Sequence, residues 1–524
     1  MHNQTSIDKV NQNVSRRDFC KIAAGTTAAL ALGSLGALNA KTAHTATFGG
    51  DELAYMSAEE LIPLFRARKL SPVEVLKAQI ARYEQFEEKT NSVTYTHFEA
   101  AMKQAQASEK RYRNGTAREL EGITVGVKDE HHDKGWIITR GSVLLKDNKM
   151  DYTDPIVTKL KAAGAVLPIQ TTAPEFYMTG VTWSKLWGVS RNPWNLKYAV
   201  GGSSGGSGGA LAAGFCTLAT GSDMGGSIRL PCAYNGLYGF KPPHSRIVSS
   251  DALAYFATAG PMARTFDDMV SLMNVMTGQT AHQPATLPRL EMPHDYPPIR
   301  GMRIAYVGSM GLAYLDADTR KGMAGAVQKL KMLGAEVDDV ALKFDWEEIV
   351  GKFIGGVLAG AMGAGLAQNV DHLDKMTSYC GYFAKKAASG KFGSAQRAEF
   401  EGLIHSLYAT ISDAVFEKGY DALIMPTLAT PHVPADYDQT VEGFMLEGHK
   451  MHKSFILALT VPWNVLNWCP VVNVPTSISP QGMPMGMQIV GKPYHDHKVF
   501  QIAHAYEGIA PRLFSGERMP DFRS

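Results

Sequence analysis

The chain has 524 residues and a formal net charge of +2, and 45% of its residues are hydrophobic, 19% are charged and 51 are glycines. This length supports a large hydrophobic core without a metal or disulfide staple, and the near-zero charge argues against a nucleic-acid binder that works by neutralising phosphates. The low charge content and frequent glycines also exclude a coiled coil and a charge-driven disordered protein, so the composition predicts a soluble globular protein of α/β type.

The first forty residues have the pattern of an export signal. Arg16 and Arg17 precede an uncharged stretch, residues 22–40, that is rich in Ala, Gly, Thr and Leu and ends in Ala-Leu-Asn-Ala. This pattern is typical of a twin-arginine signal peptide, whereas a membrane anchor is disfavoured because Ala/Gly-rich segments insert poorly. We expect residues 1–40 to be a signal peptide, residues 41–50 to be a linker, and the mature protein to be periplasmic or secreted. No later apolar run reaches the roughly 18 to 20 residues that span a bilayer, so stable membrane insertion is not expected.

Helix and strand patterns alternate along the rest of the chain. A helix begins after Ser71, because Ser can cap it, Pro72 fits its first position, and Glu74 completes a capping box. Residues 343–420 favour helices that form a lid or rim, and residues 284–298 favour a surface connection. Further helices are predicted at residues 156–163 and 318–333, and short strands at 122–127, 165–170, 302–307, 335–337, 422–425, 471–474 and 485–490. This alternation predicts one α/β domain over residues 51–524, with a large sheet between layers of helices.

The cysteines of the mature chain are widely spaced and form no Cys-x-x-Cys pair. This spacing predicts buried free thiols, and it argues against a disulfide framework and against a zinc site. The four residues are Cys216, Cys232, Cys380 and Cys469.

Two glycine-rich segments carry the strongest signal for chemistry. Residues 201–209 read GGSSGGSGG, but they lead directly into an apolar stretch and lack a following Gly-Lys-Ser/Thr, so a linker and a nucleotide-binding loop are both disfavoured. Residues 221–231 read GSDMGGSIRLP, where a serine after two glycines can be approached closely. Backbone N–H groups that converge on one point there suit the oxyanion of an acyl-transfer reaction. Lys128 ends a predicted strand upstream, and a buried lysine with a lowered pKa can serve as a general base.

These segments resemble the signature of the amidase signature hydrolases, which runs from G-G-S-S-G-G to G-G-S-I-R-x-P. Ser203 and Ser227 are 24 residues apart, which is the family spacing, and residues 126–129 resemble the strand end that carries the family's lysine. Further blocks at residues 187–195, 239–242, 426–427 and 482–491 extend the resemblance over residues 52–510. The resemblance implies the amidase signature fold, a single domain with a mixed sheet of many strands covered by helices on both faces.

The resemblance also implies a Ser–cis-Ser–Lys triad. Ser227 is the expected nucleophile and Lys128 is the expected base. Ser203, which a cis peptide bond precedes, is the expected proton relay between them. No metal and no cofactor are expected. The expected oxyanion hole consists of the backbone N–H groups of Met224, Gly225, Gly226 and Ser227, and the residues expected to brace the loop are Ser204, Asp223 and Arg229.

Some neighbouring residues depart from the family pattern or have no assigned role. His131 and His132 replace a usually apolar segment, and because adjacent side chains point apart we favour a polar rim over a metal pair. Asp129 is expected to face away from Lys128 through strand alternation. Residues 464–470 lack a family glycine, which affects the shape of the pocket and not the triad, and Cys469 is not expected to be a rival nucleophile. Four aromatic residues belong either to the core or to an apolar acyl or aryl pocket: Phe176, Tyr177, Trp183 and Trp187.

The leading functional hypothesis is an amidase that hydrolyses linear or cyclic carboxylic amides through an acyl-enzyme, with an esterase side activity. One alternative is the glutaminase (A-type) subunit of a tRNA-dependent amidotransferase, which the export signal disfavours because tRNA charging is cytoplasmic. The other is an exported binding protein without catalysis, which the retention of all three triad residues disfavours. The expected partner is a small-molecule amide; a homodimer is allowed, and no nucleic acid is expected.

Overall fold

The computed structural model describes residues 49–524 apart from 249–254, 281–284, 313, 343, 356, 358–362, 391–393, 442, 453–454 and 511. The predicted signal peptide, residues 1–40, and most of the predicted linker lie outside the described residues. Within the described part of the chain, no helix has both the length and the apolar character that crossing a membrane requires.

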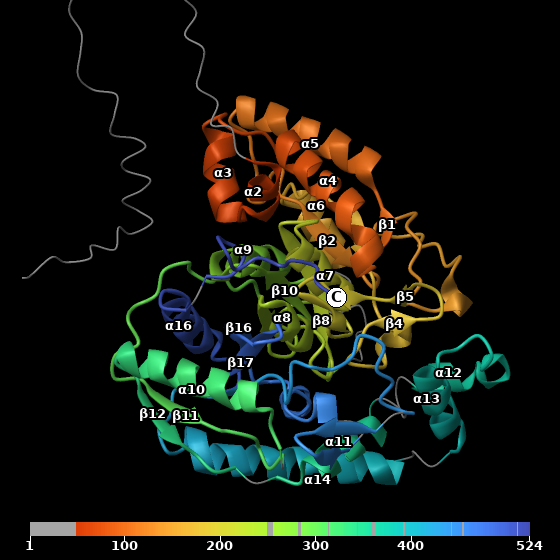
Figure 1. The fold of residues 1–524 in the computed structure, drawn as a ribbon, viewed down its shortest axis with the longest axis vertical. Helices are drawn as coiled ribbons and strands as arrows, with labels where there is room; N and C mark the ends of the chain where they lie inside the picture. Colours follow the sequence, from red (N-terminus) through yellow and green to blue (C-terminus); the bar gives the residue numbers. More distant parts are fainter. Residues whose placement is uncertain are drawn as a thin grey trace, which may run out of the picture. The chain divides into compact units, whose positions relative to one another are not determined.

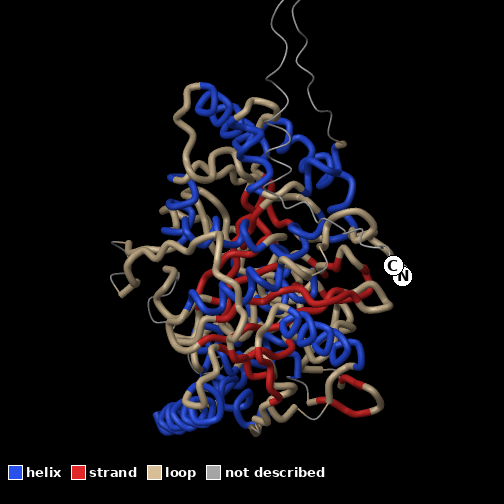
Figure 2. The backbone as a smooth tube through the Cα atoms, turned by 90° about the vertical axis from the view of Figure 1, so that its left-hand side faces the viewer, coloured by secondary structure: helices blue, strands red, loops and turns tan. Residues whose placement is uncertain are grey.

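Eleven strands of the described chain form one mixed sheet, and Figure 2 draws these and all other strands in red. In sheet order the strands are β1 (Val93–Thr96), β3 (Ile169–Thr171), β2 (Val125–Lys128), β8 (Leu218–Asp223), β10 (Thr258–Ala263), β9 (Tyr238–Lys241), β16 (Val471–Ile478), β17 (Pro484–Gly491), β13 (Ala422–Pro426), β11 (Arg303–Tyr306) and β12 (Glu336–Asp339). The six strands from β8 to β13 in this order pair antiparallel, whereas β2 pairs parallel with β3 and β8, and β11 pairs parallel with β12 and β13.

The sheet separates two hydrophobic cores, because alternate side chains of a strand point to opposite faces. In β13, Ala422 and Ile424 belong to one core, and Leu423 and Met425 belong to the other. Helices α9 (Phe266–Met276), α10 (Ala317–Met332) and α16 (Asp496–Glu507) pack in the first core. Helices α7 (Gly205–Ala213) and α8 (Arg229–Asn235) pack in the second, on the opposite face of the sheet. The predicted fold, a single α/β domain with a mixed sheet covered on both faces, is confirmed.

The remaining helices surround this sheet (Figure 1). The predicted capping box at the start of α4 is confirmed, since Glu74 N donates to Ser71 Oγ and Ser71 N donates to the Glu74 carboxylate. The predicted helical region after residue 343 is confirmed by α11 to α14. The helices are α2 (Gly50–Tyr55), α3 (Ala58–Arg66), α4 (Pro72–Thr90), α5 (Phe98–Arg113), α6 (Pro155–Ala162), α11 (Trp346–Phe353), α12 (Gly363–Ala367), α13 (Ser378–Ala388), α14 (Ser394–Ile411) and α15 (Pro462–Val465).

In the described residues, three short antiparallel strand pairs lie outside the main sheet: β4 (Trp183–Ser184) with β5 (Gly188–Val189), β6 (Arg191–Asn192) with β7 (Asn195–Ala199), and β14 (Phe444–Leu446) with β15 (His449–Met451). The strands predicted at residues 122–127, 165–170 and 302–307 are shorter in the structure, where they are β2, β3 and β11. Residues 165–170 contribute only the start of β3, because Pro168 has no N–H for the ladder, and Val166 makes a single bridge to Thr124. The four cysteines among the described residues are free and buried, as predicted.

Candidate active site

Lys128 is the last residue of β2, and its side chain is completely buried. Its Nζ donates to Ser203 Oγ at 2.9 Å and to Ser222 Oγ at 2.7 Å. The same Nζ lies 3.2 Å from Glu130 Oε2 and 4.7 Å from the centre of the Tyr177 ring. The structure therefore brings together Lys128 and Ser203, which are 75 residues apart in the chain.

Ser203 and Ser227 lie on two loops that meet at the start of α7 and α8. The peptide bond between Gly202 and Ser203 is cis, as the resemblance implied. Ser204 N donates to Ser227 O at 3.2 Å, so the two loops are in direct contact. The Ser227 hydroxyl makes no hydrogen bond to any described residue, and the bond to Ser203 that a proton relay needs is not formed. Catalytic hydrogen bonds often tighten only when substrate is bound, so the placement remains compatible with the expected triad.

Asp223, at the end of β8, holds the loop that carries Ser227. Its carboxylate accepts from Gly226 N at 2.9 Å and from Ile228 N at 3.1 Å. Gly226 has φ +117°, and a Cβ atom there would lie 2.4 Å from Thr460 Oγ1, so the loop geometry requires glycine at this position. The Gly226 N–H was expected to be an oxyanion donor, but it donates to Asp223 instead. The other expected donors, the N–H groups of Met224, Gly225 and Ser227, donate to no residue in the described part of the chain.

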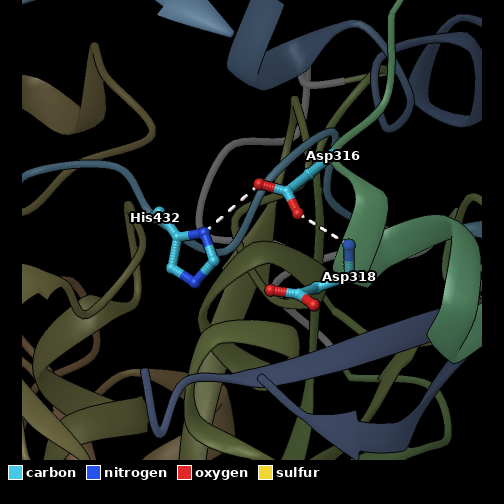
Figure 3. A group of neighbouring side chains, drawn as sticks. All are labelled: Asp316, Asp318 and His432. Carbon is cyan, nitrogen blue, oxygen red and sulfur yellow. Dashed lines mark hydrogen bonds and ion pairs between the residues drawn. The ribbon is translucent and has the colours of Figure 1, made fainter. Parts of the chain in front are cut away.

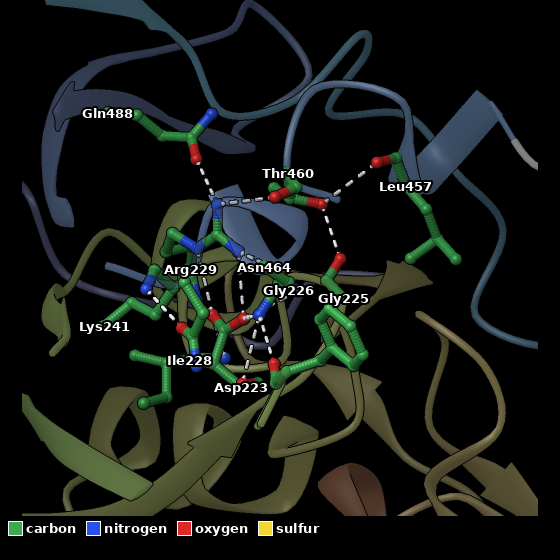
Figure 4. Close-up of polar contacts among 12 residues, drawn as sticks. Asp223, Gly225, Gly226, Ile228, Arg229, Lys241, Leu457, Thr460, Asn464 and Gln488 are labelled. Atoms are coloured by element: carbon green, nitrogen blue, oxygen red, sulfur yellow. Dashed lines mark hydrogen bonds and ion pairs between the residues drawn. The ribbon is translucent and has the colours of Figure 1, made fainter. Parts of the chain in front are cut away.

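Arg229 connects this loop to distant parts of the chain (Figure 4). It forms a buried ion pair with Asp223, with Nη2 at 2.9 Å and Nε at 3.0 Å from the carboxylate oxygens. Burial alone would raise the pKa of Asp223, but Arg229 beside it holds that pKa well below its usual range. The other Arg229 contacts are Thr460 O, Gln488 Oε1 and Asn464 Oδ1. Ser204 Oγ accepts from Ser222 N at 3.2 Å, and Ser204 N donates to Ser227 O. Ser204, Asp223 and Arg229, which were expected to brace the loop, therefore all make hydrogen bonds to it or beside it.

The charges around Lys128 oppose one another. Burial lowers the pKa of Lys128, and the Glu130 carboxylate acts in the opposite direction. Burial would raise the pKa of Glu130, but the Lys128 ammonium and other donors lower it to about 2. Asp129 points elsewhere, as expected, and accepts from Thr139 N and Gly141 N. Glu130 was missed in the sequence, although its spacing from Lys128 would place both on one side of an extended chain.

The comparisons with known proteins bear on this site directly. The sequence matches the profile of the amidase family over residues 74–500. The chain belongs to the amidase family. It is 28% identical over 484 residues to the A-type subunit of the glutamyl-tRNA(Gln) amidotransferase from Geobacter metallireducens, covering 87% of this chain and 97% of that relative.

Solved structures of amidase family members have the same fold. A bacterial aryl acylamidase of the amidase signature enzymes has a TM-score of 0.79 at 26% identity, covering 87% of this chain and 96% of that one. The 6-aminohexanoate cyclic dimer hydrolase has a TM-score of 0.76 at 27% identity, covering 90% and 99%. The expected family and fold are therefore confirmed, and cleavage of amide C–N bonds is the chemistry that this amidase fold supports.

The two histidines of this amidase chain do not form a metal pair with each other. His131 Nδ1 lies 3.5 Å from Asp154 Oδ2, and the ring of His132 packs edge-on against Tyr152. The Nε2 atoms of both histidines are buried without a hydrogen-bond partner. Both residues are buried, with exposed fractions of 1% and 3%, so they do not form the expected polar rim.

One group of three side chains in the described chain has ligand atoms close enough to hold a metal ion: Asp316, Asp318 and His432 (Figure 3). Asp316 is the N-cap of α10 and accepts from Asp318 N at 2.8 Å. The same carboxylate binds His432 Nδ1 at 3.2 Å and accepts from Thr430 Oγ1. Asp316 therefore caps α10 and binds Thr430 and His432 of the loop after β13, and these contacts account for the close approach of the three side chains.

Of the four aromatic residues that we assigned either to the core or to an apolar pocket, Phe176 and Trp183 pack against the hydrophobic core. Tyr177 lies against Lys128, whereas Trp183 Nε1 donates to Tyr437 O and Trp187 Nε1 donates to Thr139 Oγ1. Other apolar side chains flank the Ser227 loop: a Cβ atom on Gly225 would lie 3.7 to 3.9 Å from Val461, Leu457 and Phe353. Sequence reasoning missed these residues, because they come from α11 and from the segment around α15.

Proposed function

We propose that this protein hydrolyses the C–N bond of a carboxylic amide through an acyl-enzyme on Ser227. The observation that carries the proposal is the 2.9 Å contact between the buried Lys128 Nζ and Ser203 Oγ, beside the loop that holds Ser227. A lysine whose pKa is lowered by burial can accept a proton through a neighbouring hydroxyl, which is how a serine nucleophile is activated.

The reaction follows from this arrangement. Neutral Lys128 takes the Ser203 proton, Ser203 takes the Ser227 proton, and Ser227 Oγ forms a bond to the amide carbonyl carbon. The N–H groups of Met224, Gly225 and Ser227 are available for the resulting oxyanion. The proton returns through Ser203 to the nitrogen as the C–N bond breaks and the amine leaves. Water then attacks the acyl ester by the same relay and releases the carboxylic acid and free Ser227. Esters would react in the same way.

The substrate we propose is a linear or cyclic amide with an apolar or aryl group. Phe353, Leu457 and Val461 beside the Ser227 loop support an apolar group there. The names of the aryl acylamidase and the cyclic dimer hydrolase support the same class. The protein would act alone or as a homodimer. The second candidate is the glutaminase (A-type) subunit of a tRNA-dependent amidotransferase, and the names of the curated relatives favour it.

Active-site labelling and a substrate panel test these proposals. A fluorophosphonate probe should label Ser227, and Lys128→Ala should slow labelling and amide hydrolysis by about 10² or more. Ser207→Ala is the matched control, because Ser207 Oγ lies in the same glycine-rich segment but donates to Thr220 O. Label on another serine, or a folded Lys128→Ala variant with wild-type turnover, would refute the mechanism. Hydrolysis of glutamine in preference to apolar amides would support the second candidate.

We also propose that residues 1–40 export the protein through the twin-arginine pathway. Changing Arg16 and Arg17 to lysine should leave the protein in the cytoplasm, because that pathway reads the arginine pair. Fractionation of cells that express the full chain measures this, and unchanged export of the variant would contradict the proposal.

A further inference from the structure

Glu130 completes a ring of polar contacts around Lys128 Nζ. Ser222 Oγ donates to Glu130 Oε2 at 2.5 Å, and Lys128 Nζ lies 3.2 Å from the same oxygen. Lys128 Nζ also lies 2.7 Å from Ser222 Oγ and 2.9 Å from Ser203 Oγ. The lysine nitrogen therefore has three polar neighbours, which suits the three hydrogens of an ammonium group.

The direction of each hydrogen bond is constrained by what the neighbours can donate. An ionised carboxylate only accepts, so in the 3.2 Å ion pair between Lys128 and Glu130 any hydrogen comes from Lys128. Ser222 has one hydroxyl hydrogen, and it points to Glu130, so Ser222 can only accept from Lys128 as well. A neutral amine has two hydrogens and one lone pair. With its hydrogens directed at Glu130 and Ser222, the lone pair is left to face the third neighbour, Ser203.

We propose that Glu130 is a positioning residue, which together with Ser222 directs the lone pair of neutral Lys128 at the Ser203 hydroxyl. This inference rests on the proposed function, because it concerns the proton relay of the same site. It gives a role to a carboxylate that contacts both Lys128 and Ser222.

Glu130 should also affect the pH at which Lys128 becomes neutral. The charges that favour the ammonium are Glu130, which contacts it, and the more distant Asp223 and Asp129. The face of the Tyr177 ring lies over the same nitrogen, and His131 acts on Glu130. Removing the contacting charge lowers the pKa of Lys128, so the active neutral form then exists at lower pH. The rising limb of the pH profile should therefore move toward acid.

The test is the pH dependence of fluorophosphonate labelling at Ser227 and of amide hydrolysis in the mature protein. Glu130→Gln should move the midpoint of the rising limb down by about 1 to 3 pH units, the usual effect of losing an adjacent opposite charge. It should also lower the plateau rate by about tenfold or more, because the lone pair is less well oriented. Glu130→Asp should keep the midpoint within the wild-type range. Ser222→Ala should lower the plateau with a much smaller change of midpoint, because the charge remains.

Asp133→Asn is the matched control. It removes the same charge from the same loop, but Asp133 pairs with Lys161 at 2.6 Å and should leave both parameters unchanged. A folded Glu130→Gln variant with an unchanged midpoint overturns the proposal, even if its plateau rate falls. A lower plateau alone would also result if Glu130 had a purely structural role. If Glu130→Gln does not fold, the other two variants decide. A wild-type plateau rate in Ser222→Ala, or a shifted midpoint in Glu130→Asp, overturns the proposal. Failure to label Ser227 in the wild type refutes the proposed function itself.

Discussion

Replacing Arg229 with methionine removes the cation that holds the Ser227 loop. The Arg229 side chain makes five hydrogen bonds: two to Asp223 and one each to Thr460 O, Gln488 Oε1 and Asn464 Oδ1. A guanidinium has five N–H donors, so its donors are fully used. Methionine has a similar length but donates nothing, and it leaves Asp223 as a buried charge without a cation in contact with it.

The size of the effect follows from that stranded charge. Breaking a buried ion pair by removing one partner costs about 3 to 5 kcal/mol of unfolding free energy. The Asp223 carboxylate also binds Gly226 N and Ile228 N, so its rearrangement should displace the oxyanion donors. We therefore expect fluorophosphonate labelling to slow by about 10² or more, which is the usual cost of misplacing reacting groups.

A double variant separates the charge from the packing. Asp223→Asn combined with Arg229→Met removes both charges, so it should be more stable than Arg229→Met alone. Arg229→Lys keeps the charge but cannot form the planar fork, so its stability should lie between those of wild type and Arg229→Met. Urea unfolding followed by tryptophan fluorescence measures the three stabilities. An Arg229→Met variant within about 0.5 kcal/mol of wild type, the range of ordinary surface changes, would refute this reasoning.

Three further changes have defined outcomes. Gly226→Ala puts a Cβ atom 2.4 Å from Thr460 Oγ1, so labelling of the nucleophile should fall by about tenfold or more, and unchanged labelling would contradict the loop geometry. Burial raises the pKa of Asp268 to about 7, so the unfolding free energy of the wild type should fall as the pH rises from about 4 to about 7. The unfolding free energy of Asp268→Asn should increase relative to that of the wild type over the same range. Equal pH slopes in urea unfolding would contradict this. Ser71→Ala removes the acceptor for Glu74 N and should cost about 1 kcal/mol in the same assay, whereas no loss would mean that the cap contributes nothing.

Much of the fold could be predicted from local sequence, and the proposed triad from the resemblance to the amidase signature. The strands and helices were predictable because burial on both faces of a sheet leaves short apolar runs, and because caps such as Ser71 act within one helical turn. Lys128, Ser203 and Ser227 were selected because their motifs resemble the amidase signature, and the structure places Lys128 Nζ 2.9 Å from Ser203 Oγ. The orientation of Asp129 away from Lys128 followed from strand alternation alone.

Only the tertiary structure decided what surrounds these residues. Arg229 meets Thr460 and Gln488 across 231 and 259 residues of chain, and contacts of this kind leave no periodic pattern in the sequence. That Gly226 N–H donates to Asp223 was equally invisible, because Gly-Gly-Ser specifies a tight turn but not the acceptor of each amide. Glu130 could face either solvent or Lys128 until β2 and β8 were placed side by side. Side-chain hydrogen bonds depend on three-dimensional proximity, and chain order does not determine it.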